Sequence, residues 1–136
     1  MNHQEHQGHQ EIAAGIDQTA RAIIDASLKV HKALGPGLLE SAYEHCLAYE
    51  LVSRSLAVRR QVPMPIVYDE VALDAGYRLD LLVNEQVIVE IKSVDALTPL
   101  HEAQALTYLK LSKLRLALLI NFNVPLFKQG VRRLAL

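Results

Sequence analysis

The sequence predicts one α/β domain with α+β-like character, in which helices flank a mixed β-sheet in the order helix, helix, three strands, helix, two strands. Three observations lead to this prediction. Two stretches with helical spacing come first, two short runs rich in Val, Ile and Leu lie in the middle, and a helix and an apolar strand follow. A chain of 136 residues can remove roughly two-thirds of its surface from water on folding, so it needs no disulfide for stability.

The composition excludes several classes of protein. The single cysteine, Cys46, excludes an internal disulfide, and no apolar run approaches the ~20 residues of a membrane span. The first ten residues, MNHQEHQGHQ, are polar, unlike an apolar signal segment. We therefore expect a soluble, cytoplasmic protein with no membrane partner.

Two regions of biased composition lie near the ends. Residues 1–10 are rich in His and Gln without hydrophobic periodicity, which predicts a disordered tail before a single domain over 11–136. Its three histidines could bind a metal ion loosely, although a flexible tail lacks fixed ligand geometry. At the other end, six basic and no acidic residues follow Ala105, although the net charge of the chain is −1. They could track a phosphate backbone or form an ordinary solvated surface: Lys110, Lys113, Arg115, Lys128, Arg132 and Arg133.

Two helices are predicted at the start of the domain. Apolar residues follow helical spacing over 17–34, and the Gly-Pro-Gly sequence that comes next ends this helix. Helical spacing resumes from residue 38 to about residue 53, apart from the charges at Glu40 and Glu50.

The next segment, residues 58–68, contains two prolines. Pro63 and Pro65 predict an edge strand or a pair of short strands, because proline cannot donate to a β-ladder. Turn residues follow at 69–70 and 74–76.

The runs YRLDLLV and QVIVEIKS predict a β-hairpin. If Asp80 pairs with Glu90, residues 84–86 form a three-residue loop. In this register Lys92 joins both carboxylates on one face, because side chains alternate along a strand. A two-residue loop would instead pair Asp80 with Val89 and separate the carboxylates. We predict the three-residue loop.

A third helix and two strands complete the domain. Thr98 is the predicted cap and Pro99 the first residue of a helix that runs to about Leu111. The run LRLALLINF is nearly all apolar, as expected for a central strand covered on both faces. After a loop at 121–125, a short strand is predicted over about 130–134.

Two carboxylates and a lysine on one sheet face suit metal-assisted phosphoryl chemistry. Asp80 and Glu90 can hold a divalent cation such as Mg²⁺ or Mn²⁺ through oxygen. The ion would polarise a phosphate and lower the pKa of an attacking water. Lys92 could orient that water or stabilise negative charge, and Glu40 could complete the metal shell.

Gln104 and Tyr108 stand four residues apart on the third helix, hence on one face, and could hydrogen-bond substrate or metal-bound water. A structural alternative stays open on spacing alone, since the pattern Asp-x9-Glu-x-Lys occurs by chance. Asp80 could form a salt bridge with Arg78 or with the lysine, and the ExK pair could be solvated on an open sheet face.

The stretch from Gly37 to Tyr43 matches the signature of the GxxExxY protein family, and further blocks resemble the same family. These blocks are VHKALGPGLLESAYE, YRLDLLV, VIVEIKS, EAQALTYLKL and LLINFNVP. The resemblance covers about Ile16 to Leu134. The GxxExxY family is grouped with the PD-(D/E)XK nuclease superfamily. The resemblance therefore implies a restriction-endonuclease-like core, with a helix, a three-stranded antiparallel run, a helix and a further strand.

Residue by residue, the resemblance implies that Asp80 is the motif aspartate, that Glu90 and Lys92 are the ExK pair, and that Glu40 helps to bind metal. One departure is Leu79, which replaces the proline in the superfamily's name. That proline is widely dispensable, so the match is little weakened.

Gln104 and Tyr108 match a Q-x-x-x-Y element of RecB-like members. The resemblance thus implies a nuclease that hydrolyses phosphodiester bonds of DNA with Mg²⁺ or Mn²⁺. The alternative is a catalytically silent nuclease-fold module for binding or assembly. A homodimer would bring two sites to the two strands of a duplex. The sequence does not distinguish DNA from RNA.

Overall fold

Three helices and seven strands make up the described part of the chain. The computed structural model describes residues 3–136, with side chains from residue 15 onward. In chain order the elements are α1 (His3–Leu34), α2 (Glu40–Ser53), β1 (Val58–Pro63), β2 (Ile66–Tyr68), β3 (Val71–Leu73), β4 (Arg78–Val83), β5 (Val87–Lys92), α3 (Pro99–Ser112), β6 (Leu116–Asn121), the 3₁₀ helix η1 (Phe127–Gly130) and β7 (Val131–Ala135).

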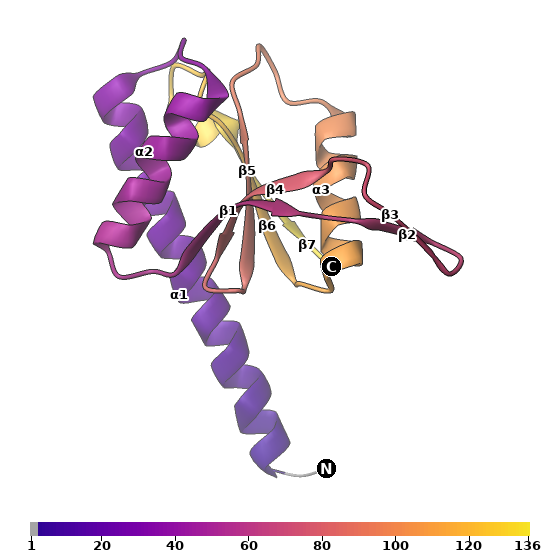
Figure 1. The fold of residues 1–136 in the computed structure, drawn as a ribbon. Helices are drawn as coiled ribbons and strands as arrows, with labels where there is room; N and C mark the ends of the chain where they lie inside the picture. The colour runs from indigo at the N-terminus through magenta and orange to yellow at the C-terminus, as the bar shows by residue number, and fades with distance from the viewer. Residues whose placement is uncertain (1–2) are drawn as a thin grey trace.

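A five-stranded mixed sheet forms the middle layer, in the order β1-β4-β5-β6-β7. β5 and β6 run parallel, and the other neighbours run antiparallel. Figure 1 shows α1 and α2 on one face of the sheet and α3 on the other. The α3 crossover joins the two parallel strands, as a parallel pair requires. The predicted class, helices flanking a mixed sheet, is confirmed.

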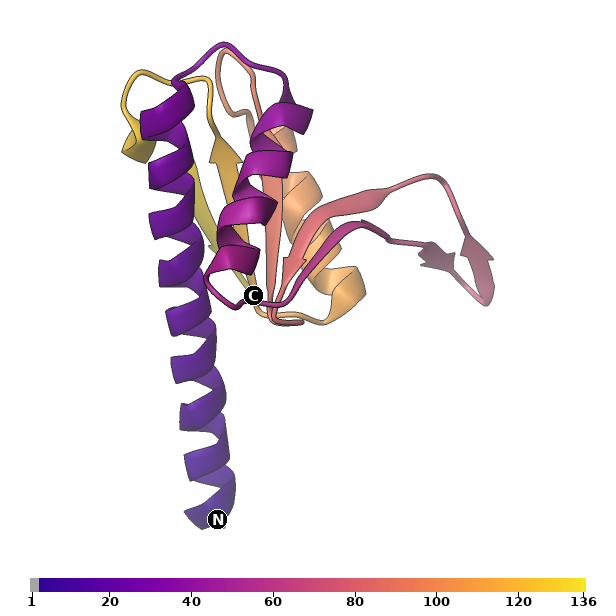
Figure 2. The ribbon, with the colours of Figure 1, turned by 60° about the vertical axis from the view of Figure 1, so that its left-hand side comes forward.

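The first helix starts earlier than the sequence predicts. α1 begins at His3, so the predicted disordered tail is helical over 3–10, while Met1 and Asn2 lie outside the described residues. Glu, Gln and Ala extend an existing helix at little cost, which explains the difference. Figures 1 and 2 show this first part running past the sheet. The side chains of its histidines lie outside the described ones, and the division into tail and domain stays a prediction.

The larger core lies between the sheet and the first two helices. The rings of Tyr43 and Phe122 stack nearly parallel there, with centroids 4.6 Å apart. A smaller cluster packs α3 against the opposite face through Tyr108, Leu79 and Ile88. All six residues of β6 are buried, which confirms the predicted central strand. The sheet is thus buried on both faces where charged residues of β4 and β5 must be accommodated.

The predicted register of the charged hairpin is confirmed. Leu81 pairs with Val89 and Val83 pairs with Val87, which leaves residues 84–86 as the three-residue loop. Asn84 and Glu85 adopt left-handed backbone conformations, both with φ 53°. Asparagine tolerates this conformation better than most residues, so Asn84 determines where the chain turns.

A two-stranded arm, residues 64–77, projects from the main sheet (Figure 2). It contains β2 and β3, and the predicted pair of short strands corresponds to β1 and β2. The sequence did not predict β3, because it lies between two turn-rich segments. Tyr68 on this arm is 74 % exposed, so the arm contributes little to the core.

We expect Asn84→Ala to lower the free energy of unfolding by ~2 kcal/mol, because the substitution removes two hydrogen bonds and strains the loop. The Asn84 side chain accepts from the Ala57 N–H at 2.9 Å and donates to Thr19 Oγ1 at 3.2 Å. Urea unfolding measures the change. Asn84→Gly separates the causes, since glycine tolerates positive φ and loses only the side-chain bonds. A loss below ~0.5 kcal/mol in the alanine variant would show that this loop does not fix the register.

Candidate active site

Asp80 and Glu90 lie where β4 and β5 stop pairing. The ladder between these strands ends at Leu81 and Val89, and beyond it each carboxylate accepts a backbone hydrogen bond from the opposite strand. Glu90 Oε1 accepts from the Asp80 N–H at 3.3 Å. Asp80 Oδ2 accepts from the Ile91 N–H at 2.7 Å. The two side chains therefore replace ladder bonds at the point where the strands diverge.

Burial is the main cause of the raised pKa values of the two carboxyl groups. Glu90 is only 5 % exposed, and burial followed by the charge of Asp80 raises its pKa to about 9. Burial also raises the pKa of Asp80, with a smaller contribution from Glu44. The ammonium of Lys92 lowers the pKa of both groups. At neutral pH the pair thus holds a proton unless a nearby cation compensates its charge.

Lys92 is the last residue of β5 and lies beside Asn121 of β6. Asn121 is buried and holds the chain that leaves β5. Its Oδ1 accepts from the Val94 N–H at 3.0 Å, and its Nδ2 donates to the Val94 carbonyl at 2.9 Å. Nothing in the sequence indicated this role, because an asparagine after an apolar strand resembles any loop residue.

Glu40 is the first residue of α2 and reaches the end of β5. Its Oε1 accepts from the Ser93 N–H at 3.3 Å, and Ser93 Oγ donates to the Leu38 carbonyl at 2.6 Å. Tyr43 fixes the loop before the helix, since its hydroxyl donates to the Gly35 carbonyl and accepts from the Leu38 N–H. The Gly-x-x-Glu-x-x-Tyr pattern therefore has a clear local function: it positions Glu40 at this end of the sheet.

A cavity of about 370 Å³ lies between α2, β1 and β4, and both Glu40 and Asp80 line it. The sequence did not predict three further lining residues, Glu44, Arg60 and Gln61. Glu44 follows Glu40 by one helical turn, which is a usable signal, whereas nothing in the sequence of β1 indicated the other two.

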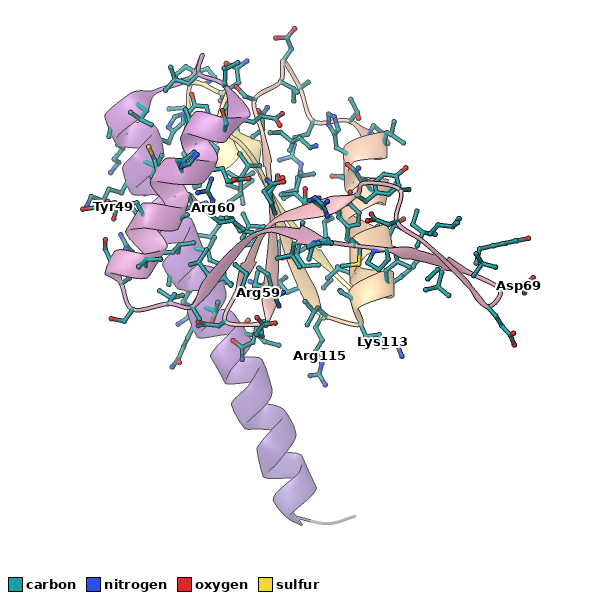
Figure 3. The ribbon with its side chains drawn as sticks, viewed as in Figure 1. Tyr49, Arg59, Arg60, Asp69, Lys113 and Arg115 are labelled. Atoms are coloured by element: carbon teal, nitrogen blue, oxygen red, sulfur yellow. The ribbon has the colours of Figure 1, made fainter. Side chains whose placement is uncertain are left out.

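Glu44 and Arg60 form a partly buried ion pair in this cavity. Arg60 Nη2 lies 2.7 Å from Glu44 Oε2, and Gln61 donates to the other carboxylate oxygen. Figure 3 shows Arg60 beside α2. Gln61 has φ 52° and lies opposite Asp80, between the Arg60–Leu81 and Val62–Leu79 pairs. This left-handed residue interrupts β1 beside the carboxylate, and such strain often marks a functional site.

Gln104 and Tyr108 meet on α3, as their spacing predicted. Gln104 Nε2 donates to Tyr108 Oη at 3.1 Å. Tyr108 is buried, and burial followed by the charges of Glu90 and Asp80 raises its pKa to about 12. The phenol therefore stays protonated at neutral pH and can donate a hydrogen bond.

The carboxylate oxygens suit a hard divalent cation, but the protein supplies few of them. Asp80 and Glu90 provide carboxylate oxygens whose pKa values are raised mainly by burial, and a cation bound between them would stabilise their charged forms. Within the side chains that the structure describes, no three His, Cys, Asp or Glu residues are grouped so that they could hold a metal ion. Water or substrate oxygens would have to supply most of the remaining ligands, as is usual for Mg²⁺.

The basic residues of the C-terminal part do not form one track. Arg133 pairs with Asp17 at 2.8 Å, and Arg132 lies 3.7 Å from Glu102. Lys113 and Arg115 lie at the end of the sheet where β6 begins, away from Lys92 (Figure 3). The interpretation of these residues as a solvated surface therefore fits the structure better than a phosphate track.

Among the described residues, no helix combines the length and the apolar composition that a membrane span needs.

Comparison with known proteins gives a match to a protein family. A family model described as the PD-(D/E)XK nuclease superfamily matches residues 17–134. No curated protein and no solved structure gave a significant match.

The raised pKa of Glu90 predicts how stability depends on pH without metal. Between pH 4.5 and about 9 the folded state holds a proton on Glu90 that the unfolded state releases, so stability falls as pH rises. We expect the free energy of unfolding in EDTA to fall by ~1 kcal/mol or more from pH 6 to pH 8. Urea unfolding at both pH values measures it.

Glu90→Gln should flatten this dependence and stabilise the metal-free protein at pH 8, because the amide oxygen can still accept from the Asp80 N–H. Glu85→Gln, an exposed carboxylate variant, is the matched control and should keep the slope. An unchanged slope in Glu90→Gln would contradict the assignment of the proton to the pair.

Proposed function

The chain belongs to the PD-(D/E)XK nuclease superfamily, and from this premise we propose that it is a metal-dependent nuclease that hydrolyses phosphodiester bonds of DNA. Members of this superfamily are typically nucleases that use divalent metals. One observation carries the proposal. Asp80 and Glu90 share a buried position where two strands diverge, and Lys92 follows on the same strand.

In this proposal Asp80 and Glu90 hold Mg²⁺ or Mn²⁺, and Glu40 acts from the end of α2. When bound, the cation supplies Lewis acidity toward the phosphate and lowers the pKa of an attacking water. Hydrolysis joins the water oxygen to phosphorus and breaks one P–O ester bond. A proton must leave the water, and another must reach the leaving oxygen.

The chain's own residues then have separate tasks. Lys92 holds its ammonium beside the carboxylates, where it can orient the water or stabilise charge on the phosphate oxygens. Tyr108, kept protonated, can donate to a phosphate oxygen or a water, and Gln104 fixes the orientation of its hydroxyl. These roles are positional and electrostatic, as phosphoryl transfer generally requires.

Within the superfamily, the chain is proposed to be a GxxExxY protein. The spacing of Gly37, Glu40 and Tyr43 supports membership of the GxxExxY family, with one nuclease-like domain over 11–136. Gly37 has φ 100°, which favours glycine. We place the protein in the cytoplasm, where the free thiol of Cys46 would stay reduced.

A second candidate is a catalytically silent module that keeps the nuclease fold for binding or assembly. One observation favours it: no group of three metal-ligating side chains is assembled among the described residues. A homodimer is compatible with either candidate, since Tyr49 on the outer face of α2 is 71 % exposed (Figure 3). A monomeric mass by light scattering at micromolar concentration would contradict the dimer.

We expect the purified protein to cut single-stranded, duplex or branched DNA with Mg²⁺ or Mn²⁺. Lys92→Ala and Asp80→Asn should each lower the rate by ~10²-fold or more, because they remove electrostatic stabilisation at the reacting phosphate. Lys110→Ala, an exposed lysine on α3, is the control and should retain the rate. Absence of cleavage, or equal residual cleavage in Lys92→Ala, would count against a nuclease.

Metal binding separates the two candidates without an activity assay. Titration calorimetry with Mn²⁺ should show binding to the wild-type protein, loss of binding in Asp80→Asn and weaker binding in Glu40→Gln. Glu40 has the smaller effect because it contacts the end of β5 and not the carboxylate pair. Glu102→Gln is the matched control. A silent module would give no Mn²⁺ heat in any variant.

A further inference from the structure

A second cavity, of about 400 Å³, lies on the α3 face of the sheet. One wall is a stripe of α3 with Leu100, Ala103 and Thr107, whose spacing of three and four residues places them on one helix face. The arm forms the opposite wall with Ile66 and Tyr77. The small side chains of Ala103 and Thr107 leave the hollow, and the tyrosine borders it. We call this cavity the α3 cleft.

The α3 cleft adjoins the candidate active site through a shared residue. Tyr108 lines the cleft, and it also packs in one cluster with Leu79 and Ile88. Leu79 directly precedes Asp80, and Ile88 lies on the same strand face as Glu90, two residues earlier. Tyr108 therefore lies between the α3 cleft and the strand residues that flank the carboxylates, and the charges of Glu90 and Asp80 act on its hydroxyl.

The lining of the α3 cleft is mostly apolar and partly aromatic. It includes His101 but no Lys, Arg, Asp or Glu, so the cleft suits a ligand group without a formal charge. The rings of Tyr77 and Tyr108 meet edge to face with centroids 6.4 Å apart. Tyr77 is 41 % exposed, which leaves part of its ring free for stacking.

Polar atoms at the cleft can read an edge of a planar ligand. Gln104 donates to Tyr108 through Nε2, which leaves its Oε1 as an acceptor toward a ligand. Thr107 donates its hydroxyl proton to the Ala103 carbonyl, so its lone pairs remain available. An apolar slot with an aromatic wall and a few acceptors matches the chemistry of a nucleobase.

We propose that the α3 cleft binds one unpaired nucleobase of the strand whose phosphate lies at Asp80 and Glu90. This inference rests on the proposed nuclease function and narrows its substrate. Bases in a B-form duplex are paired and stacked, and entering the cleft would require unpairing. Single strands, frayed ends and flaps already present such a base. The protein is therefore a nuclease for single-stranded or unpaired DNA, and duplex is a poor substrate.

The alternative occupant is a side chain of a partner polypeptide or of a second copy. Exposed apolar side chains nearby support that alternative, with Leu100 77 % exposed and Val67 on the arm 60 % exposed. We favour the base because Tyr108 lines the cleft and lies close enough to the carboxylates for their charges to act on it, whereas the most exposed apolar residues of the arm do not line the cleft.

Binding to single strands with and without bases tests the proposal directly. The probes are a fluorescent (dT)₁₂ strand, an abasic strand of equal length, and a duplex of the labelled strand. All proteins carry Lys92→Ala so that the strands stay uncut, and anisotropy is read with Mg²⁺ present. We expect (dT)₁₂ to bind about tenfold more tightly than the abasic strand or the duplex, since one stacked base contributes this much.

Tyr77→Ala should bring the affinity for (dT)₁₂ down to that for the abasic strand, while Tyr77→Phe should keep the difference because it retains the ring. Tyr68→Ala is the matched control, because this exposed tyrosine lies on the same arm and does not line the cleft. Circular dichroism checks that each variant is folded.

Three results would overturn the proposal: equal affinity for the three probes, a base preference unaffected by Tyr77→Ala, or an equal loss in Tyr68→Ala. Loss of self-association in Tyr77→Ala by light scattering, with DNA affinity unchanged, would assign the cleft to a protein contact instead. If the nuclease proposal is wrong, cleavage and Mn²⁺ binding are absent, while base-dependent affinity for DNA can persist.

Discussion

The structure depends on how it accommodates two carboxylates inside a sheet. Burying a charge costs several kcal/mol unless hydrogen bonds or an opposite charge compensate it. Here β4 and β5 diverge after the Leu81–Val89 pair, and each freed backbone N–H donates to a carboxylate of the other strand. These two hydrogen bonds compensate both the loss of ladder bonds and the burial of the acids.

The layers on both faces of the sheet serve this one position. On one side Tyr43 fixes the loop before α2, so that Glu40 reaches the end of β5. On the other side α3 places Tyr108 over the residues that flank the carboxylates. Two cavities flank this position: the one between α2, β1 and β4 has charged walls, and the α3 cleft contains no Lys, Arg, Asp or Glu. Phosphate chemistry and base recognition can be divided between them.

Local signals were sufficient for the parts of the site that lie on one hairpin. Turn length and strand alternation determine the register, so the placement of Asp80 opposite Glu90 could be predicted from a few residues. The Thr98 cap and the contact between Gln104 and Tyr108 were equally local, and the structure contains both. The proximity of Glu40 to β5 was not local, and only the family blocks indicated it.

Other features had no local signal at all. Arg60 and Gln61 are ordinary polar residues of an edge strand until tertiary packing brings Glu44 against them. The start of α1 at His3 could not be predicted, because a polar composition without apolar periodicity is compatible with a continued helix as well as with disorder. The catalytic roles themselves stay proposals, because the same carboxylates can support chemistry or only shape a pocket.

The raised pKa of Glu90 connects stability with ligand binding. Without a cation the pair can remain buried only by holding a proton, because two charges so close and so shielded from water repel each other. A divalent cation bound there would compensate both charges and release that proton, so its affinity should rise with pH through the range where Glu90 titrates. The metal-free fold would then lose stability in the same pH range in which the affinity for a cation rises. A carboxylate pair that served only the fold would gain nothing from this arrangement, since an amide at position 90 could accept the same backbone hydrogen bond without the charge.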